Sequence, residues 1–198
     1  RKVDDKWERA NNMGTPINTP GFDGAPSLSA DGRTLFFSSV RSGGLGQRDI
    51  WMTTLKPDGG WNTPVNMGDS INTPFNDESP YIHPDGKTLY FSSNRPGGQG
   101  GFDIWKIAID PLGNLVGDAI NLGYPVNSDL DEVTPFFHEA SSTLFFSSNG
   151  HNSIGGLDVY KSFYDKDGET FNTPANLGLP INSSKDDAYL IWDTKLMK

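Results

Sequence analysis

An acidic residue recurs at one position along this 198-residue chain, at intervals of 54 or 55 residues. The four copies are Asp23, Asp77, Glu132 and Asp187. Gathered carboxylates can bind a hard cation through several oxygens, or attract a positively charged group of a partner. The alternative is structural, because a loop carboxylate also accepts hydrogen bonds from the backbone N–H groups of its own loop. We expect the four side chains to accept such bonds beside the mouth of a channel, where they are candidate residues for binding a ligand or partner.

A second acidic position precedes a strand-like segment in three places. Its copies are Asp49, Asp103 and Asp158. Here we predict a structural role, in which each carboxylate accepts hydrogen bonds across a turn. The sequence contains no Asp-x-Asp-x-Asp-Gly calcium loop, so neither acidic position predicts a metal site. No cofactor is predicted either.

The histidines and serines do not combine into a metal or catalytic site. His83 and His138 are equivalent, but Ser29 and Asp193 hold the same position in the other copies, so a third ligand is missing. Serine pairs recur at 38–39, 92–93 and 147–148 without a recurring histidine. Because a serine nucleophile needs a base within hydrogen-bond reach, we predict that these are polar residues at strand ends.

A glycine-rich segment, GKTLYFSSNRPGGQGGFDIW, spans residues 86–105. A phosphate-binding loop of this composition would lead into the N-terminus of a helix. Related segments occur at 32–51 and 141–160, and all three lead into strand-like sequence. The glycines are therefore expected to form a tight, partly left-handed connection between two antiparallel strands.

These residues belong to a repeating unit of about 54 residues, a period typical of solenoids and propellers. Four short strands are predicted in each unit. The first three are exemplified by residues 78–84, 88–93 and 103–109. The fourth is weaker, and its example, WNTPVNMG at 61–68, follows the third strand of the preceding unit. Asp-Gly pairs between the first two strands indicate hairpin turns. Prolines in the fourth strand suit an outer edge, where a missing N–H costs nothing.

Period-two alternation along these strands predicts which side chains are buried. Between sheets we expect Leu35, Phe37, Leu89, Phe91, Leu144 and Phe146. We also expect the equivalent rings of Trp51, Trp105 and Tyr160 to pack between neighbouring units. The third unit departs from the pattern, since SNGHNS replaces SNRPGG, and any role of Arg95 is not expected to carry over to it.

Four antiparallel strands per unit, the weakest outermost, predict an all-β fold of propeller blades. The predicted repeats span approximately 7–60, 61–114, 115–169 and 170–198, the last being partial. The chain begins within the sequence motif of a fourth strand and ends within a first strand. We therefore expect an incomplete propeller, with three whole blades and parts of two, cut from a longer chain.

The sequence SPYIHPDGKTLYFSSNRPGGQGGFDIW at 79–105 resembles the TolB-type, WD-like propeller repeat, and the resemblance covers essentially the whole chain. The GGxGGxDIW and NLGxPINT motifs are similar to the propeller region of PorE-like envelope proteins of the OmpA family, which are linked to the type IX secretion system. The resemblance implies a periplasmic, outer-membrane-associated protein with envelope protein partners, including secretion-system subunits. It implies contact with peptidoglycan only through other domains of the parent protein.

The net charge of −9 argues against nucleic-acid binding, which needs a basic surface. No apolar run is long enough for a membrane span, which needs about 18 residues. There are no cysteines, so disulfides and thiolate metal sites are excluded.

Repetition without a unique reactive group favours a non-catalytic interaction module. Two alternatives stay open: a propeller glycosidase or sialidase-like enzyme, and an accessory propeller of a serine peptidase. The segment SADGRT differs from a sialidase Asp-box, because Asp31 and Gly32 are adjacent and Leu35 follows. No pair of carboxylates is singled out for glycoside hydrolysis.

Overall fold

A computed structural model describes residues 2–3, 6–110 and 112–191 of the chain. The described part is built from strands, with one short 3₁₀ turn, η1 (Glu139–Ser141). Three antiparallel sheets follow one another along the sequence, and a short pair, β1 (Lys2–Val3) and β2 (Lys6–Trp7), precedes them.

In each sheet the first four strands form a meander in which consecutive strands pair. The first contains β3 (Asp23–Leu28), β4 (Thr34–Ser39), β5 (Asp49–Thr54) and β6 (Val65–Asn66). The second contains β7 (Asp77–Ile82), β8 (Thr88–Ser93), β9 (Asp103–Ile109) and β10 (Leu115–Asn121). The third contains β11 (Glu132–His138), β12 (Thr143–Ser148), β13 (Asp158–Asp165), β14 (Thr170–Phe171) and β15 (Ala175–Asn176), with β14 and β15 both paired to β13.

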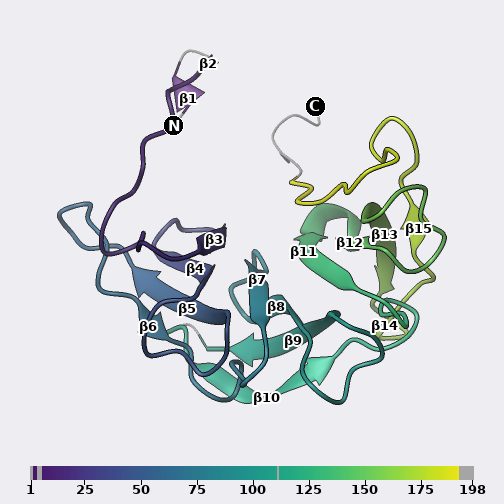
Figure 1. Cartoon of the computed structure of the whole chain (residues 1–198), viewed down its shortest axis with the longest axis horizontal. Coiled ribbons are helices and arrows are strands. Elements are labelled where there is room, and N and C mark those ends of the chain that lie inside the picture. Colours follow the sequence, from purple (N-terminus) through teal and green to yellow (C-terminus); the bar gives the residue numbers. More distant parts are fainter. Residues whose placement is uncertain (1, 4–5, 111, 192–198) are drawn as a thin grey trace.

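The sheets form blades arranged along an arc, with β3, β7 and β11 on its concave side (Figure 1). The all-β, partial-propeller prediction is therefore confirmed. The sheet bounds are offset from the repeat bounds predicted from sequence, because the outer strand of each sheet lies in the following sequence unit. Within the described residues, no helix has the length and apolarity that crossing a bilayer would require.

The hydrophobic core lies between the blades. All six side chains predicted to be buried between sheets are at most 5% exposed, although Leu35 and Phe37 pack in a cluster of the first blade with Trp51 and not between two sheets. Trp105 and Ile107 face the first blade, where they pack with Phe36 and Ile50. Ile104, on the opposite face of β9, packs with residues of the third blade, as period-two alternation requires. The equivalent rings Trp51, Trp105 and Tyr160 are buried, as predicted.

The glycine-rich connection has the predicted left-handed character, with φ of 95° at Gly97. It also has a function that the sequence did not indicate. A Cβ on Gly100 would overlap the carbonyl oxygen of Leu130, in the loop that leads into the next blade. Gly46 and Gly155 make the same close approach to their own following loops. Adjacent blades therefore contact each other through bare backbone at this point.

The recurring NLGxPINT motif, whose copies lie at 12–19, 66–73, 121–128 and 176–183, also joins neighbouring blades. Its buried asparagine, Asn127, accepts a hydrogen bond from the backbone N of Ile104 (2.8 Å) and donates one to the Ile104 carbonyl (3.0 Å). Asn72 and Asn182 form the same pair of bonds with Ile50 and Val159. Each asparagine thus stands in for a strand residue beside the third strand of the preceding blade.

Candidate functional site

The recurring acid of the second blade, Asp77, is fully buried at the start of β7. One carboxylate oxygen accepts hydrogen bonds from the backbone N and the hydroxyl of Thr73, at 2.6 and 2.8 Å. The other accepts bonds from Ser93 (2.5 Å) and from the guanidinium of Arg95 (2.6 Å). Arg95 in turn lies over the ring of Trp105, 5.1 Å from its centroid. Both oxygens are therefore fully used inside the protein.

Asp23 repeats this arrangement with Thr19, Ser39 and Arg41. Burial alone would raise the pKa of the Asp23 carboxyl, but the bonds from Ser39, Thr19 and Arg41 outweigh it and lower the pKa from 3.8 to about 2. The depressed pKa means that Asp23 stabilises the fold fully above the pKa of an unfolded aspartate, about 4. This contribution is lost as pH falls from about 4 towards 2.

We expect the free energy of unfolding to fall less steeply between pH 4 and pH 2 in Asp23→Asn than in the wild type, because the variant has no carboxyl to protonate there. Urea unfolding at half-unit pH steps measures the slope. Asp118→Asn, at an exposed position on β10, is the matched control. Equal slopes in Asp23→Asn and the wild type would show that the bonds around Asp23 do not lower its pKa.

The third blade holds its acid differently. Gly150 stands at the position of Arg95, and a side chain there would overlap Ser128 and approach Glu132. Glu132, one methylene longer than aspartate, fills this space and accepts bonds from Ser128 and Ser148. The next residue, His151, places its Nε2 3.0 Å from the Val126 carbonyl and 3.8 Å from Glu132.

His151 therefore occupies the place that the guanidinium of Arg95 occupies in the second blade. Its backbone is left-handed, with φ of 48°, and its ring lies 5.2 Å from that of Tyr160, the equivalent of Trp105. The expectation that the role of Arg95 would not carry over to this blade needs correction in part: His151 takes over the contact with a loop carbonyl, but not the short bond to the acid. The sequence comparison missed it because the substitute lies one residue further along.

The last copy, Asp187, accepts bonds from the backbone N and hydroxyl of Ser183, at 2.6 and 2.9 Å. The prediction that these four acids accept hydrogen bonds from loop amides is thus confirmed. Asp77 and Glu132, however, are 0% exposed. These two carboxylates therefore do not face solvent, because they turn into the loops they cap. The candidate binding role of the position stays a prediction.

The second acidic position has the structural role predicted for it. Asp49 accepts hydrogen bonds from the backbone N of Leu45 and Gly46 in its glycine-rich connection. Asp103 and Asp158 accept equivalent bonds from Gln99 and Ile154. Burial raises the pKa of Asp103 despite the bonds from Gln99, Gly100 and Asn121, and the negative charge of Asp131 raises it further.

The two equivalent histidines lie at strand ends, as predicted. His83 Nδ1 accepts a bond from the backbone N of Asp85 (3.2 Å), and its ring packs 4.8 Å from that of Phe137. His138 Nδ1 lies 2.7 Å from the hydroxyl of Ser141. Among the described residues, no three acidic or histidine side chains are close enough to hold one metal ion.

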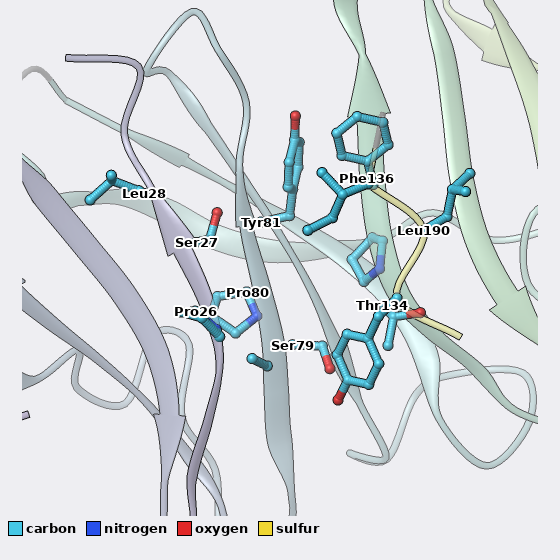
Figure 2. Close-up of a pocket in the computed structure, with 13 residues that line it drawn as sticks. Pro26, Ser27, Leu28, Ser79, Pro80, Tyr81, Thr134, Phe136 and Leu190 are labelled. Carbon is cyan, nitrogen blue, oxygen red and sulfur yellow. The ribbon is translucent and has the colours of Figure 1, made fainter. Parts of the chain in front are cut away.

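An open cavity, which the sequence analysis did not predict, lies on the concave side of the arc. Its volume is about 320 Å³. β3, β7 and β11 contribute residues 25–28, 79–81 and 134–136, and residues 189–191 complete it. Figure 2 shows Tyr81 and Phe136 side by side, with Leu190 next to Phe136; the two rings meet edge to face at 5.2 Å. We call this the channel cavity.

A bulge in each inner strand shapes the channel cavity. The pairing of β7 with β8 shifts register between Glu78 and Tyr81. Ser79 has a positive φ of 54°, and Pro80 follows it. The same left-handed position recurs at Ala25, Thr134 and Tyr189. Because proline has no N–H, it removes one hydrogen-bond donor from this inner edge.

The side chains that line the channel cavity are apolar, hydroxyl-bearing or aromatic. Tyr81 and Tyr189 are the titratable groups among these described residues. Burial and the nearby Glu139 raise the pKa of Tyr81 to about 12, and its hydroxyl donates to the Phe137 carbonyl at 2.8 Å. The described residues that line the channel cavity therefore include no carboxylate, imidazole or amine for acid–base chemistry.

Solved structures with the same architecture include TolB from Acinetobacter baumannii, which is 15% identical, with a TM-score of 0.53 over 77% of this chain and 32% of that one. A putative TolB from Agrobacterium tumefaciens is 20% identical, with a TM-score of 0.53 over 88% and 55%. An α-L-arabinofuranosidase from Lactobacillus brevis is 13% identical, with a TM-score of 0.56 over 85% and 59%. The shared fold is the β-propeller.

At these identities the likeness concerns the fold alone, which TolB proteins and glycosidases have in common. The chain spans about a third to just over half of the length of the two TolB structures. No family model matches the sequence, and no curated protein matches it either.

Proposed function

We propose that this chain is a non-catalytic interaction propeller of a bacterial cell-envelope protein, periplasmic and associated with the outer membrane. Its partner is a second envelope protein. The PorE-like motifs of the sequence imply a secretion-system subunit. Peptidoglycan would be reached through other domains of the parent protein. The partner docks in the channel cavity.

The observation that carries this proposal is the chemistry of the channel cavity. Glycoside hydrolysis needs two carboxylates, and acyl transfer needs a nucleophile with a base. Among its described lining residues the channel cavity offers neither, and the recurring acid Asp77 is committed to Thr73, Ser93 and Arg95. An apolar concave surface with a few hydroxyls is suited to binding.

The proposal is tested by photo-crosslinking in the native envelope, with a photoreactive amino acid in the parent protein at Leu28 or at Val116. These two aliphatic residues are equally exposed, 52% and 53%. Leu28 lines the channel cavity, and Val116 lies on the outer strand β10. We expect a discrete envelope-protein adduct from position 28 and none from position 116.

Two results would contradict the proposal. One is equal crosslinking from both positions, which would place the partner elsewhere or show non-specific contact. The other is turnover of an arabinoside, xyloside or peptide substrate that disappears when a single residue lining the channel cavity is replaced. That result would favour the hydrolase alternatives.

A further inference from the structure

A smaller cavity lies between the second and third blades, on the outer side of the arc (Figure 1). Its volume is about 150 Å³, and it shares no described lining residue with the channel cavity. Phe171 and Leu122, which pack in the core between these blades, form its apolar wall. Lys106 of β9, Tyr164 of β13 and Glu169, just before β14, supply polar groups. We call this the junction cavity.

The equivalent place at the first junction between blades is filled by apolar side chains. Met52 and Met67 stand at the repeat positions of Lys106 and Leu122. Both methionines pack against the hydrophobic core, where their flexible side chains fill the gap between the sheets. Lysine ends in an ammonium group that an apolar core excludes. The change from Met52 to Lys106 therefore makes the second junction polar where the first is closed.

Tyr124 adds an exposed aromatic ring to the junction cavity. It is 78% exposed, and within the described part of the chain its hydroxyl forms no hydrogen bond. The NLGxPINT motif does not require a ring here, because Asp69 and Leu179 occupy this position in the neighbouring copies. The ring therefore has no evident role in the fold, and its flat face is free to stack on the apolar face of a ligand.

Two opposite charges line the junction cavity without serving the fold. Among the described residues, neither the ammonium group of Lys106 nor the carboxylate of Glu169 takes part in a hydrogen bond or an ion pair. An anionic ligand would meet the like charge of Glu169, and a cationic ligand that of Lys106. A hydroxyl group can accept a hydrogen bond from the ammonium and donate one to the carboxylate. The pair therefore favours a neutral ligand with several hydroxyls.

We propose that the junction cavity binds a pyranose ring of a neutral saccharide. The apolar face of the ring stacks on Tyr124, and its hydroxyls bond to Lys106, Glu169 and the phenol of Tyr164. The cavity is smaller than the range of about 300–1,000 Å³ that is usual for drug-sized ligands, so it suits one ring of a longer saccharide. This site is separate from the channel cavity and does not depend on the proposed function.

The test is titration of the ¹⁵N-labelled chain with three neutral trisaccharides: cellotriose, maltotriose and triacetylchitotriose. We expect at least one of them to shift the backbone amide signals around Tyr124 and Tyr164. Tyr124→Ala should weaken this binding roughly 3- to 10-fold, because the stacking surface is lost. Lys106→Met, which restores the methionine of the first junction, should weaken it by a similar factor, because a charged donor is lost.

Leu179→Ala is the matched control, since Leu179 occupies the same motif position as Tyr124, also precedes a proline and is 75% exposed. This variant should bind the saccharide as the wild type does. Leu28→Ser, which alters the lining of the channel cavity, should also leave the binding unchanged.

The charge of the probe tests the selection of a neutral ligand. Fully deacetylated chitotriose, a cation, and trigalacturonate, an anion, should both bind more weakly than the neutral trisaccharide. Tighter binding of either one would overturn the inference, because a single charge would then select the ligand. It would also be overturned if none of the three neutral trisaccharides bound, or if Tyr124→Ala left their binding unchanged. Saccharide binding lost in Leu28→Ser but kept in Tyr124→Ala would place the sugar in the channel cavity instead.

Discussion

Replacing Asp77 with alanine should lower the free energy of unfolding by about 3–5 kcal/mol, because it leaves a buried arginine without its counter-ion. The side chain of Arg95 is only 10% exposed and cannot move to bulk water without losing its contacts with Phe91 and Trp105. The backbone N of Thr73 and the hydroxyl of Ser93 would lose their acceptor as well.

Urea unfolding of Asp77→Ala, followed by tryptophan fluorescence, measures this cost. Asp118→Ala is the control, since it removes an exposed aspartate of β10 and should change stability by no more than about 0.5 kcal/mol. A double variant, Asp77→Ala with Arg95→Met, should recover part of the loss by removing the unpaired charge. If Asp77→Ala were as stable as the control, the buried network would not be what holds this loop to its blade.

The structural role of the recurring acidic position could be predicted only in part from the sequence. Its recurrence in loops before strands correctly predicted hydrogen bonds to loop amides. Its burial could not be predicted, because it depends on Arg95, 18 residues later in the chain, folding back over the carboxylate. Likewise, a repeat alignment pairs Gly150 with Arg95. Such an alignment cannot show that the left-handed backbone of His151 brings its ring to the place of the Arg95 guanidinium.

The strands and their inward faces were predictable, because alternation and Asp-Gly turns are local signals. The channel cavity was not, since it is formed by residues of three blades that meet only after folding. One signal was present in the sequence: a proline at the same place in each inner strand, in GAPSL, ESPYI and VTPFF. Proline inside a strand indicates a bulge or an unpaired edge, and here both occur.

The NLGxPINT motif recurs visibly in the sequence, but its structural role depends on a long-range contact. Asn127 in this motif is 23 residues from Ile104, and both are almost completely buried. The sequence motif shows that the asparagine recurs. Only the folded chain shows that its amide satisfies both backbone groups of a strand residue in the preceding blade.

Asn127→Leu should therefore destabilise the chain by about 2–5 kcal/mol, although leucine has a similar volume and is more apolar. The substitution leaves the N–H of Ile104 buried without a partner, at about 1–3 kcal/mol, and removes one of the two bonds to its carbonyl, which still accepts one from the backbone N of Leu122. Asn62→Leu is the matched control, because Asn62 is exposed and its side-chain bond to Thr54 lies at the surface. Hydrogen exchange at Ile104 separates this mechanism from a general packing defect: the amide should lose its protection in Asn127→Leu more than Ile107 does. If both variants unfold at the same urea concentration, hydrophobic burial alone holds the second and third blades together, and the asparagine is not required.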